Sequence, residues 1–129
     1  MADDGPVLIE ILARKNCDNR GMAITLVERV VEESGIPAQI DVIDVTSLAQ
    51  AKKRRFLGSP TVRVEGRDVD RGVNGGGDFS LDDRVYRTAR GLAGWPDEQW
   101  VREAILLAAA RTTTNGNHKS STSSSATSP

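Results

Sequence analysis

Gly58-Ser59-Pro60-Thr61-Val62-Arg63-Val64-Glu65-Gly66 is the stretch of this sequence that decides its fold. The residues from Pro60 to Val64 alternate in polarity, which predicts a β-strand because successive side chains of a strand point to opposite faces. The pair Glu65-Gly66 predicts a tight turn, and Arg67-Asp68-Val69 predicts a returning strand. The segment therefore reads as a β-hairpin that is entered through a proline.

A strand and a helix are predicted at the N-terminal end of the chain. The run Val7-Leu8-Ile9-Glu10-Ile11-Leu12 is short and almost wholly apolar, which predicts a strand buried on both faces of a central sheet. After Cys17, apolar residues recur every three or four positions and predict one face of a helix: Ala23, Leu26, Val27, Val30 and Val31. Asp18 or Asn19 is expected to cap the start of this helix, and Gly35 to end it.

A second strand and a second helix are predicted between this helix and the hairpin. Residues 40–45 are rich in β-branched side chains, which favours a strand. Ser47 and Gln50 form a capping box at the start of a helix that Gly58 is expected to close. The basic run Lys52-Lys53-Arg54-Arg55 falls on the last turns of that helix, and no aromatic residues are interleaved with it. We interpret it as a solvated basic face and not as a nucleic-acid patch.

Beyond the hairpin the sequence predicts a loop and one more helix. Residues 70–83 are predicted to form the loop, and its run Gly75-Gly76-Gly77 lacks the flanking strand, helix and Lys-Ser/Thr pair of a phosphate-binding loop. Residues 84–88 are predicted to form a short strand or a short helix. The last helix is predicted to have Pro96 at its first position and to end near Arg111.

Length and composition indicate one domain with a polar tail. The chain has 129 residues, of which we assign 1–111 to a single domain. Residues 112–129 contain 11 Ser or Thr and are predicted to be a disordered tail. Basic and acidic residues number 17 and 18, which favours no nucleic-acid partner. The absence of a long apolar run and the acidic N-terminus predict a cytoplasmic protein without a membrane partner.

The single cysteine, Cys17, limits the chemistry that the chain can perform. One cysteine allows no internal disulfide, and one histidine beside it does not supply the ligands of a structural zinc site. Many lone cysteines are small buried apolar residues without a chemical role. Cys17, however, precedes a predicted helix start and has basic neighbours at Arg14, Lys15 and Arg20, which favours the thiolate form.

The predicted order of strand, helix, strand, helix, hairpin and helix is that of the thioredoxin arrangement, an α/β fold with a central mixed β-sheet flanked by helices. The segment 56–68, together with Arg84-Val85-Tyr86-Arg87-Thr88 and Gly91-Leu92, resembles small bacterial thioredoxin-like proteins that are often labelled thioredoxin family or alkylmercury lyase. The resemblance covers roughly residues 7–108. It implies that Cys17 is the thiol site and that Pro60 is a cis-proline.

Two departures from the family pattern bear on function. Members commonly carry Asp-Gly-Cys-Pro at the first site and a second cysteine just before the Arg-x-Tyr segment. Here the first site reads Lys15-Asn16-Cys17-Asp18, and the second position is Asp83. Arg20 also stands where the second cysteine of a Cys-x-x-Cys pair would resolve a mixed disulfide, which excludes dithiol turnover. One thiol likewise falls short of the paired cysteines that organomercurial cleavage uses.

A monothiol route remains, and it is the function that the sequence favours. Cys17 would attack a disulfide in a protein or small molecule, and a second thiol such as glutathione would release it as a co-substrate, without a bound cofactor. Pro60 would shape the groove and expose the backbone of Ser59 to an extended substrate. Ser59, Thr61 and Arg20 are the candidate substrate-binding residues.

The alternative is a thioredoxin-fold protein without catalysis. Such a module would use the same groove to bind a thiol-containing partner, a peptide or a soft metal ion at a single thiolate. A role related to organomercurials is a weaker third hypothesis. Replacing Cys17 with serine separates the first two hypotheses, because only the first requires the thiol for disulfide exchange.

Overall fold

The computed structural model describes residues 5–72 and 79–116, with the side chains of 112–116 left aside. The glycine run 75–77 and tail residues 117–129 lie outside the described residues. The elements follow one another as β1 (Val7–Ala13), α1 (Arg20–Ser34), β2 (Ala38–Asp44), α2 (Leu48–Lys53), β3 (Thr61–Val64), β4 (Arg67–Asp68), β5 (Tyr86–Thr88), β6 (Gly91–Ala93) and α3 (Glu98–Gly116).

The main sheet has four strands in the order β2-β1-β3-β4. β1 pairs with β2 in parallel and with β3 antiparallel, so Ile9 lies between Ile40 and Val64. β3 and β4 form the predicted hairpin, in which Glu65 and Gly66 both have positive φ angles of 52° and 82°. Two positive φ angles are the requirement of the tight hairpin turn that matches the twist of the strands. The chain is therefore an α/β protein with a mixed sheet.

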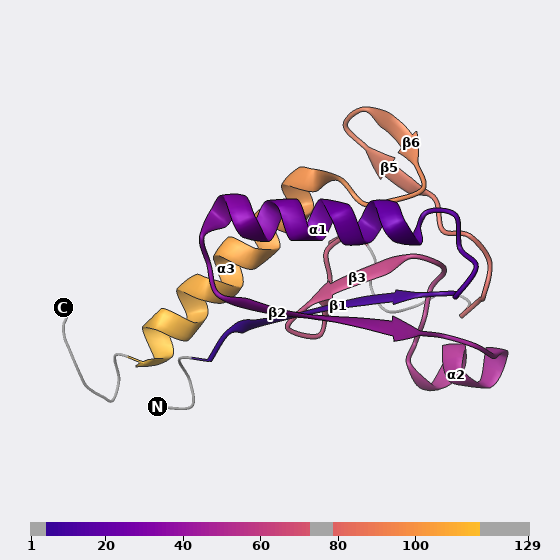
Figure 1. Ribbon diagram of the computed structural model, residues 1–129, viewed down its shortest axis with the longest axis horizontal. Coiled ribbons are helices and arrows are strands. Elements are labelled where there is room, and N and C mark those ends of the chain that lie inside the picture. The colour runs from indigo at the N-terminus through magenta and orange to yellow at the C-terminus, as the bar shows by residue number, and fades with distance from the viewer. Residues whose placement is uncertain (1–4, 73–78, 117–129) are drawn as a thin grey trace.

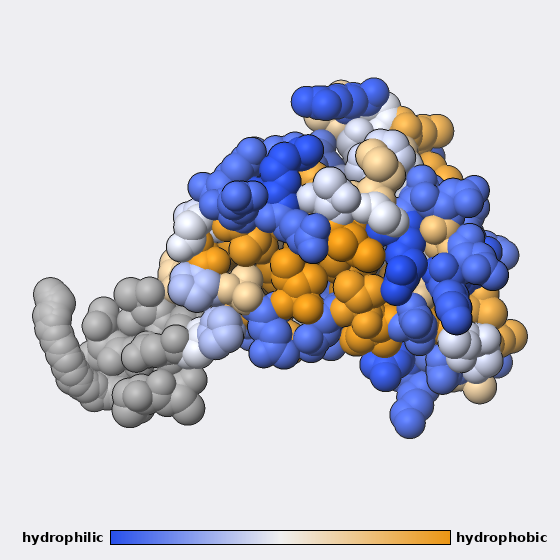
Figure 2. All heavy atoms as spheres, in the orientation of Figure 1, coloured by the Kyte–Doolittle hydropathy of each residue, from blue (hydrophilic) through white to orange (hydrophobic). Residues whose placement is uncertain are grey.

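Helices cover both faces of this sheet (Figure 1). α1 and α3 lie on one side, and the short α2 lies on the other side, near the end of β2. The larger hydrophobic core lies between the sheet and α1 and α3, and it includes Ile9 and Ile11 of β1, which are fully buried. The smaller core lies under α2 and joins Leu12 to Phe56. In the space-filling view apolar atoms reach the surface between α1 and the edge strand β2 (Figure 2).

The start of α1 differs from the prediction, whereas its end agrees. Asn19 occupies the N-cap position, but neither it nor Asp18 accepts a capping hydrogen bond in the described structure. The side chain of Asn19 lies instead against Gly94, so closely that a Cβ on Gly94 would come within 2.1 Å of Asn19 Nδ2. The Asn19 side-chain amide therefore packs against Gly94 and does not cap the helix. Gly35 closes α1 in the left-handed conformation as predicted.

The second helix is shorter than the sequence predicts. Ser47 Oγ accepts from the Gln50 backbone N–H as expected, but α2 ends at Lys53 and does not reach Gly58. Arg55 adopts a positive φ of 56°, and the Phe56 N–H donates to the Ala51 carbonyl at 2.8 Å. This closure turns Phe56 into the smaller core, where its side chain is fully buried. Burying the Phe56 ring stabilises the fold more than one additional turn of α2 would.

The C-terminal part settles the segment for which the sequence left two options. Tyr86–Thr88 is a strand, and it pairs with β6 to form a separate hairpin. Asp97 caps α3 by accepting the Gln99 N–H at 2.8 Å, so the expectation that Pro96 is the first helical residue is wrong. The helix backbone continues to Gly116, past the predicted end at Arg111, because extending a formed helix costs less than starting one. No helix in residues 5–72 and 79–116 is long and apolar enough to cross a membrane.

Candidate functional site

Cys17 lies in the turn that joins β1 to α1. Its N–H donates to the Arg14 carbonyl at 3.2 Å, and its own carbonyl accepts the Arg20 N–H at 3.2 Å. The side chain is buried, with the residue 7% exposed. The two backbone bonds fix the turn on both sides of the cysteine, so the thiol has a defined position at the carboxyl end of β1.

The two arginines that border this turn are held by carboxylates. Arg14 forms an ion pair with Asp83, and Arg20 forms one with Asp44 at 3.1 Å. In both arginines the Nε–H is buried and has no hydrogen-bond partner among the described residues. A buried donor without a partner costs about 1 to 3 kcal/mol. Arg20, a predicted substrate-binding residue, therefore uses Nη2 in its ion pair with Asp44, whereas its Nε–H has no hydrogen-bond partner among the described residues.

Ser59 connects the turn to the entrance of β3. The Arg14 N–H donates to Ser59 Oγ at 3.0 Å, so the loop before β3 lies beside the turn that carries Cys17. The Ser59–Pro60 peptide bond is cis, as the resemblance implies. Residues that are far apart in sequence thus meet at one end of the sheet, where Leu12 of β1 pairs with Thr61 of β3.

The backbone of Ser59 is not open to a substrate in this structure. Its N–H donates to the Asp82 carbonyl at 2.9 Å, and its carbonyl accepts the Arg84 N–H at 2.8 Å. Ser59 and Asp83 form an isolated parallel bridge, and the Arg14–Asp83 ion pair holds the same segment. An extended substrate could therefore pair with Ser59 only if it displaced these contacts. The chain's own segment 82–84 occupies that position.

Thr61 also has a structural contact set in place of the expected substrate contact. It is fully buried, and its hydroxyl donates to the Gly58 carbonyl at 2.7 Å. The same hydroxyl accepts from Arg84 Nη1 at 3.2 Å. The hydroxyl both donates and accepts inside the protein, and substrate binding by Thr61 stays a prediction.

Arg84 and Tyr86 form a buried polar network that sequence reasoning missed. The Arg84 side chain is 8% exposed, pairs with Asp68 at 2.7 Å and lies over the Tyr86 ring at 4.3 Å. The Tyr86 hydroxyl donates to the Pro60 carbonyl at 2.5 Å. The available signal was the Arg-x-Tyr pattern, which the resemblance singled out without giving it a role. Through these contacts Arg84 and Tyr86 support the loop that carries Ser59 and Pro60.

Burial raises the pKa of Tyr86 well above its usual value of 10.0. A phenol whose pKa is raised on folding contributes stability below the unfolded pKa and loses it as the pH rises past that value. We therefore expect the free energy of unfolding of the wild type to fall faster above pH 10 than that of Tyr86→Phe, by up to about 1.4 kcal/mol per pH unit. Urea unfolding of both proteins between pH 8 and about 11.5 measures the difference. Parallel curves would contradict this expectation.

Other candidate ligands do not gather at the site. Among the described residues, no group of three or more histidine, cysteine, aspartate or glutamate side chains is placed to hold a metal ion. The structure brings Cys17, Ser59 and Pro60 to one end of the sheet. Thr61 is buried there, and its hydroxyl bonds to Gly58 and Arg84. Comparison with protein-family models, curated proteins and solved structures finds no match to this chain.

Proposed function

We propose that this chain is a thioredoxin-like protein whose Cys17 thiol exchanges with small disulfides. The sheet order β2-β1-β3-β4, with α1 and α3 on one face, supports the fold assignment. The single observation that carries the functional proposal is the place of Cys17. It lies on a fixed turn at the carboxyl end of β1, next to the loop of Ser59.

The occupied backbone of Ser59 narrows the substrate class. An extended peptide would need the N–H and the carbonyl that Asp82 and Arg84 already use. A small disulfide such as a glutathione mixed disulfide does not need a strand edge. Its carboxylates suit the guanidinium groups of Arg14 and Arg20, whose side chains are 35% and 32% exposed, because hydrogen bonds between guanidinium and carboxylate are charge-assisted. Glutathione-type thiols are abundant in the cytoplasm, which is the compartment that we propose.

The proposed reaction is balanced by a thiol from solution. The Cys17 thiolate attacks the glutathione sulfur of a mixed disulfide, the substrate sulfur leaves as a thiolate, and that thiolate takes up a proton. Cys17 is then bonded to glutathione. A second glutathione thiolate attacks this bond, forms oxidised glutathione and returns Cys17 to the thiolate. The net reaction converts the mixed disulfide and one glutathione thiol into the free substrate thiol and oxidised glutathione.

Incubation with oxidised glutathione tests the proposal directly. We expect the folded wild type to gain the mass of one glutathionyl group and Cys17→Ser to gain none, and we expect glutathione to remove the adduct. The rate of Cys17 alkylation by iodoacetamide, followed across pH in the folded and denatured protein, is the control for access. Labelling that is slower in the folded protein at every pH, without adduct formation, would refute the proposal.

A second candidate function is favoured by the burial of Cys17, which leaves the residue 7% exposed. In this alternative the chain is a thioredoxin-like binding module without catalysis, and the cysteine fills the turn. The partner would be a thiol-containing molecule, a peptide that displaces segment 82–84, or a soft metal ion. Unchanged function of Cys17→Ser in the host, with no exchange by the parent protein, would support this alternative.

A further inference from the structure

A cleft of about 640 Å³ lies between the β3–β4 hairpin and α3. Its volume is typical of small-molecule sites, which span roughly 300 to 1,000 Å³. The walls come from the loop after α2, the hairpin, the segment that follows β4, and the second half of α3. The lining residues are Arg55, Leu57, Arg63, Val64, Gly66, Arg67, Asp68, Val69, Arg71, Ala104, Leu107 and Arg111.

The charge of this lining is strongly positive. Five arginines face one carboxylate, that of Asp68, and Arg84 already pairs with it at 2.7 Å from outside the cleft. Within the part of the chain that the structure describes, Arg67, Arg71 and Arg111 form no ion pair with a carboxylate. Like charges on one small surface repel each other, so an anion bound there would remove an unfavourable interaction.

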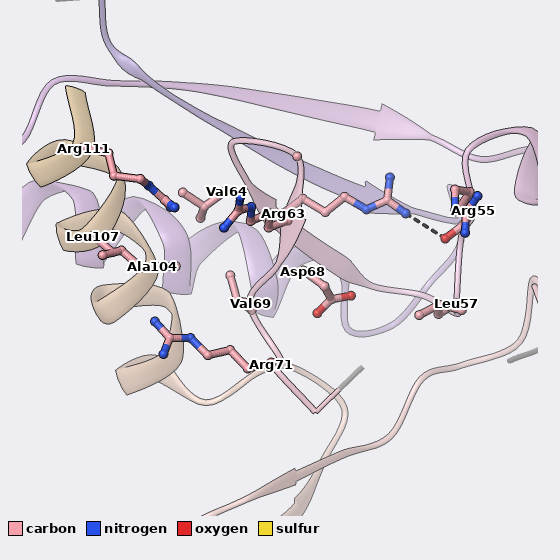
Figure 3. Close-up of a pocket in the computed structure, with 12 residues that line it drawn as sticks. Arg55, Leu57, Arg63, Val64, Asp68, Val69, Arg71, Ala104, Leu107 and Arg111 are labelled. Carbon is pink, nitrogen blue, oxygen red and sulfur yellow. Dashed lines mark hydrogen bonds between the residues drawn. The ribbon is translucent and has the colours of Figure 1, made fainter. Parts of the chain in front are cut away.

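The side chains are arranged so that two of the arginines face the same space (Figure 3). Arg71 reaches from the segment after β4 toward α3, and Arg111 reaches from α3 toward Val64. Arg63 turns the other way, where its guanidinium donates to the Arg54 and Arg55 carbonyls, each at 2.8 Å. Burial lowers the pKa of Arg63 from its usual range. Arg71 and Arg111 are thus the donors that an anion in the cleft could meet, and Arg63 adds a positive charge held by the Arg54 and Arg55 carbonyls.

Apolar side chains form the floor between these arginines. Val64 and Val69 come from the hairpin region, and Ala104 and Leu107 come from α3. Val64 and Val69 are each 3% exposed, whereas Leu107 is 43% exposed, so the floor is buried at the sheet and open to solvent at the helix. A ligand that fits this lining has an anionic group for the arginines and an apolar part for the floor.

We propose that the cleft binds a small organic phosphate, a phosphate ester that carries an apolar group. Guanidinium groups match the phosphate oxygens with paired hydrogen bonds, which makes arginine the preferred residue for phosphate recognition. Two guanidinium groups from different elements, one on each side of an apolar floor, can hold the phosphate while the ester group lies on the floor. The site is separate from Cys17, so it does not depend on the thiol chemistry proposed above.

Calorimetric titration of the full chain with phenyl phosphate tests the assignment, with inorganic phosphate as the probe that lacks the apolar part. We expect phenyl phosphate to bind more tightly than inorganic phosphate. Arg71→Gln and Arg111→Gln should each weaken its binding about tenfold, because each removes a charge-assisted contact. Arg87→Gln is the matched control, since Arg87 is exposed on β5 and does not line the cleft. Cys17→Ser should bind as the wild type does.

Three outcomes would overturn the proposal. Equal binding of inorganic phosphate and phenyl phosphate would remove the role of the apolar floor. Equal weakening by Arg87→Gln would show attraction to the overall charge and no built site. Binding confined to an oligonucleotide or to vesicles that contain phosphatidic acid would assign the arginines to a nucleic acid or a membrane surface. Circular dichroism of each variant establishes that the fold is intact in these comparisons.

Discussion

Arg84→Met is expected to lower the free energy of unfolding by about 3 to 5 kcal/mol. The Arg84 and Asp68 side chains are only 8% and 13% exposed, so removing the guanidinium leaves Asp68 as a nearly buried charge without its partner. The substitution also removes the hydrogen bond to Thr61 and the contact over the Tyr86 ring. Breaking one side of a buried pair is costly because the remaining ion has already lost its water.

Chemical denaturation of three variants distinguishes this effect from a general loss of an ion pair. Arg29→Met removes a partly exposed pair with Glu98 and is expected to cost less than about 1 kcal/mol. The double variant Arg84→Met with Asp68→Leu removes both charges and is expected to recover much of the loss. If the double variant is no more stable than Arg84→Met alone, the unpaired Asp68 charge is not the cause of the destabilisation.

The elements that the sequence predicts well are those whose residues carry a local pattern. Apolar residues that recur at helical spacing lead to α1, and the alternation around Val62 and Val64 leads to the β3–β4 hairpin. Gly35 ends α1 because a left-handed residue is a local requirement. In each case the information lies within a few neighbouring positions, so the pattern and the structure agree.

The features that the sequence does not predict depend on contacts between distant parts of the chain. The Asn19 side chain packs on Gly94 and does not cap α1. Ser59 pairs with segment 82–84, and nothing near Ser59 in the sequence indicates that this segment returns to it. The arginines of the cleft are likewise scattered from the loop after α2 to the end of α3. Only the tertiary fold brings such residues together.

Gly58→Ala is expected to destabilise the protein by about 3 kcal/mol, through the same part of the molecule that Arg84 supports. Gly58 has a φ of +131°, which residues with a Cβ rarely adopt. A Cβ there would lie 3.0 Å from Arg84 Cβ and 3.3 Å from the Asp82 carbonyl oxygen, which is tighter than most packed contacts and would force these neighbours to shift. Backbone strain and crowding each contribute roughly 1 to 3 kcal/mol at such positions.

Gly21→Ala provides the matched comparison, because it makes the same chemical change at a position without either constraint. Gly21 lies in α1, and a Cβ there would meet nothing within 4 Å. Alanine in a helix is better than glycine by roughly 0.5 to 1 kcal/mol, so this variant should unfold at the same or a higher urea concentration than the wild type. Gly58→Ala is therefore expected to lower the free energy of unfolding, whereas Gly21→Ala is expected to keep or raise it. If Gly58→Ala were as stable as Gly21→Ala, segment 82–84 would not be packed against the Ser59 loop in solution, and Ser59 would be open to a substrate after all.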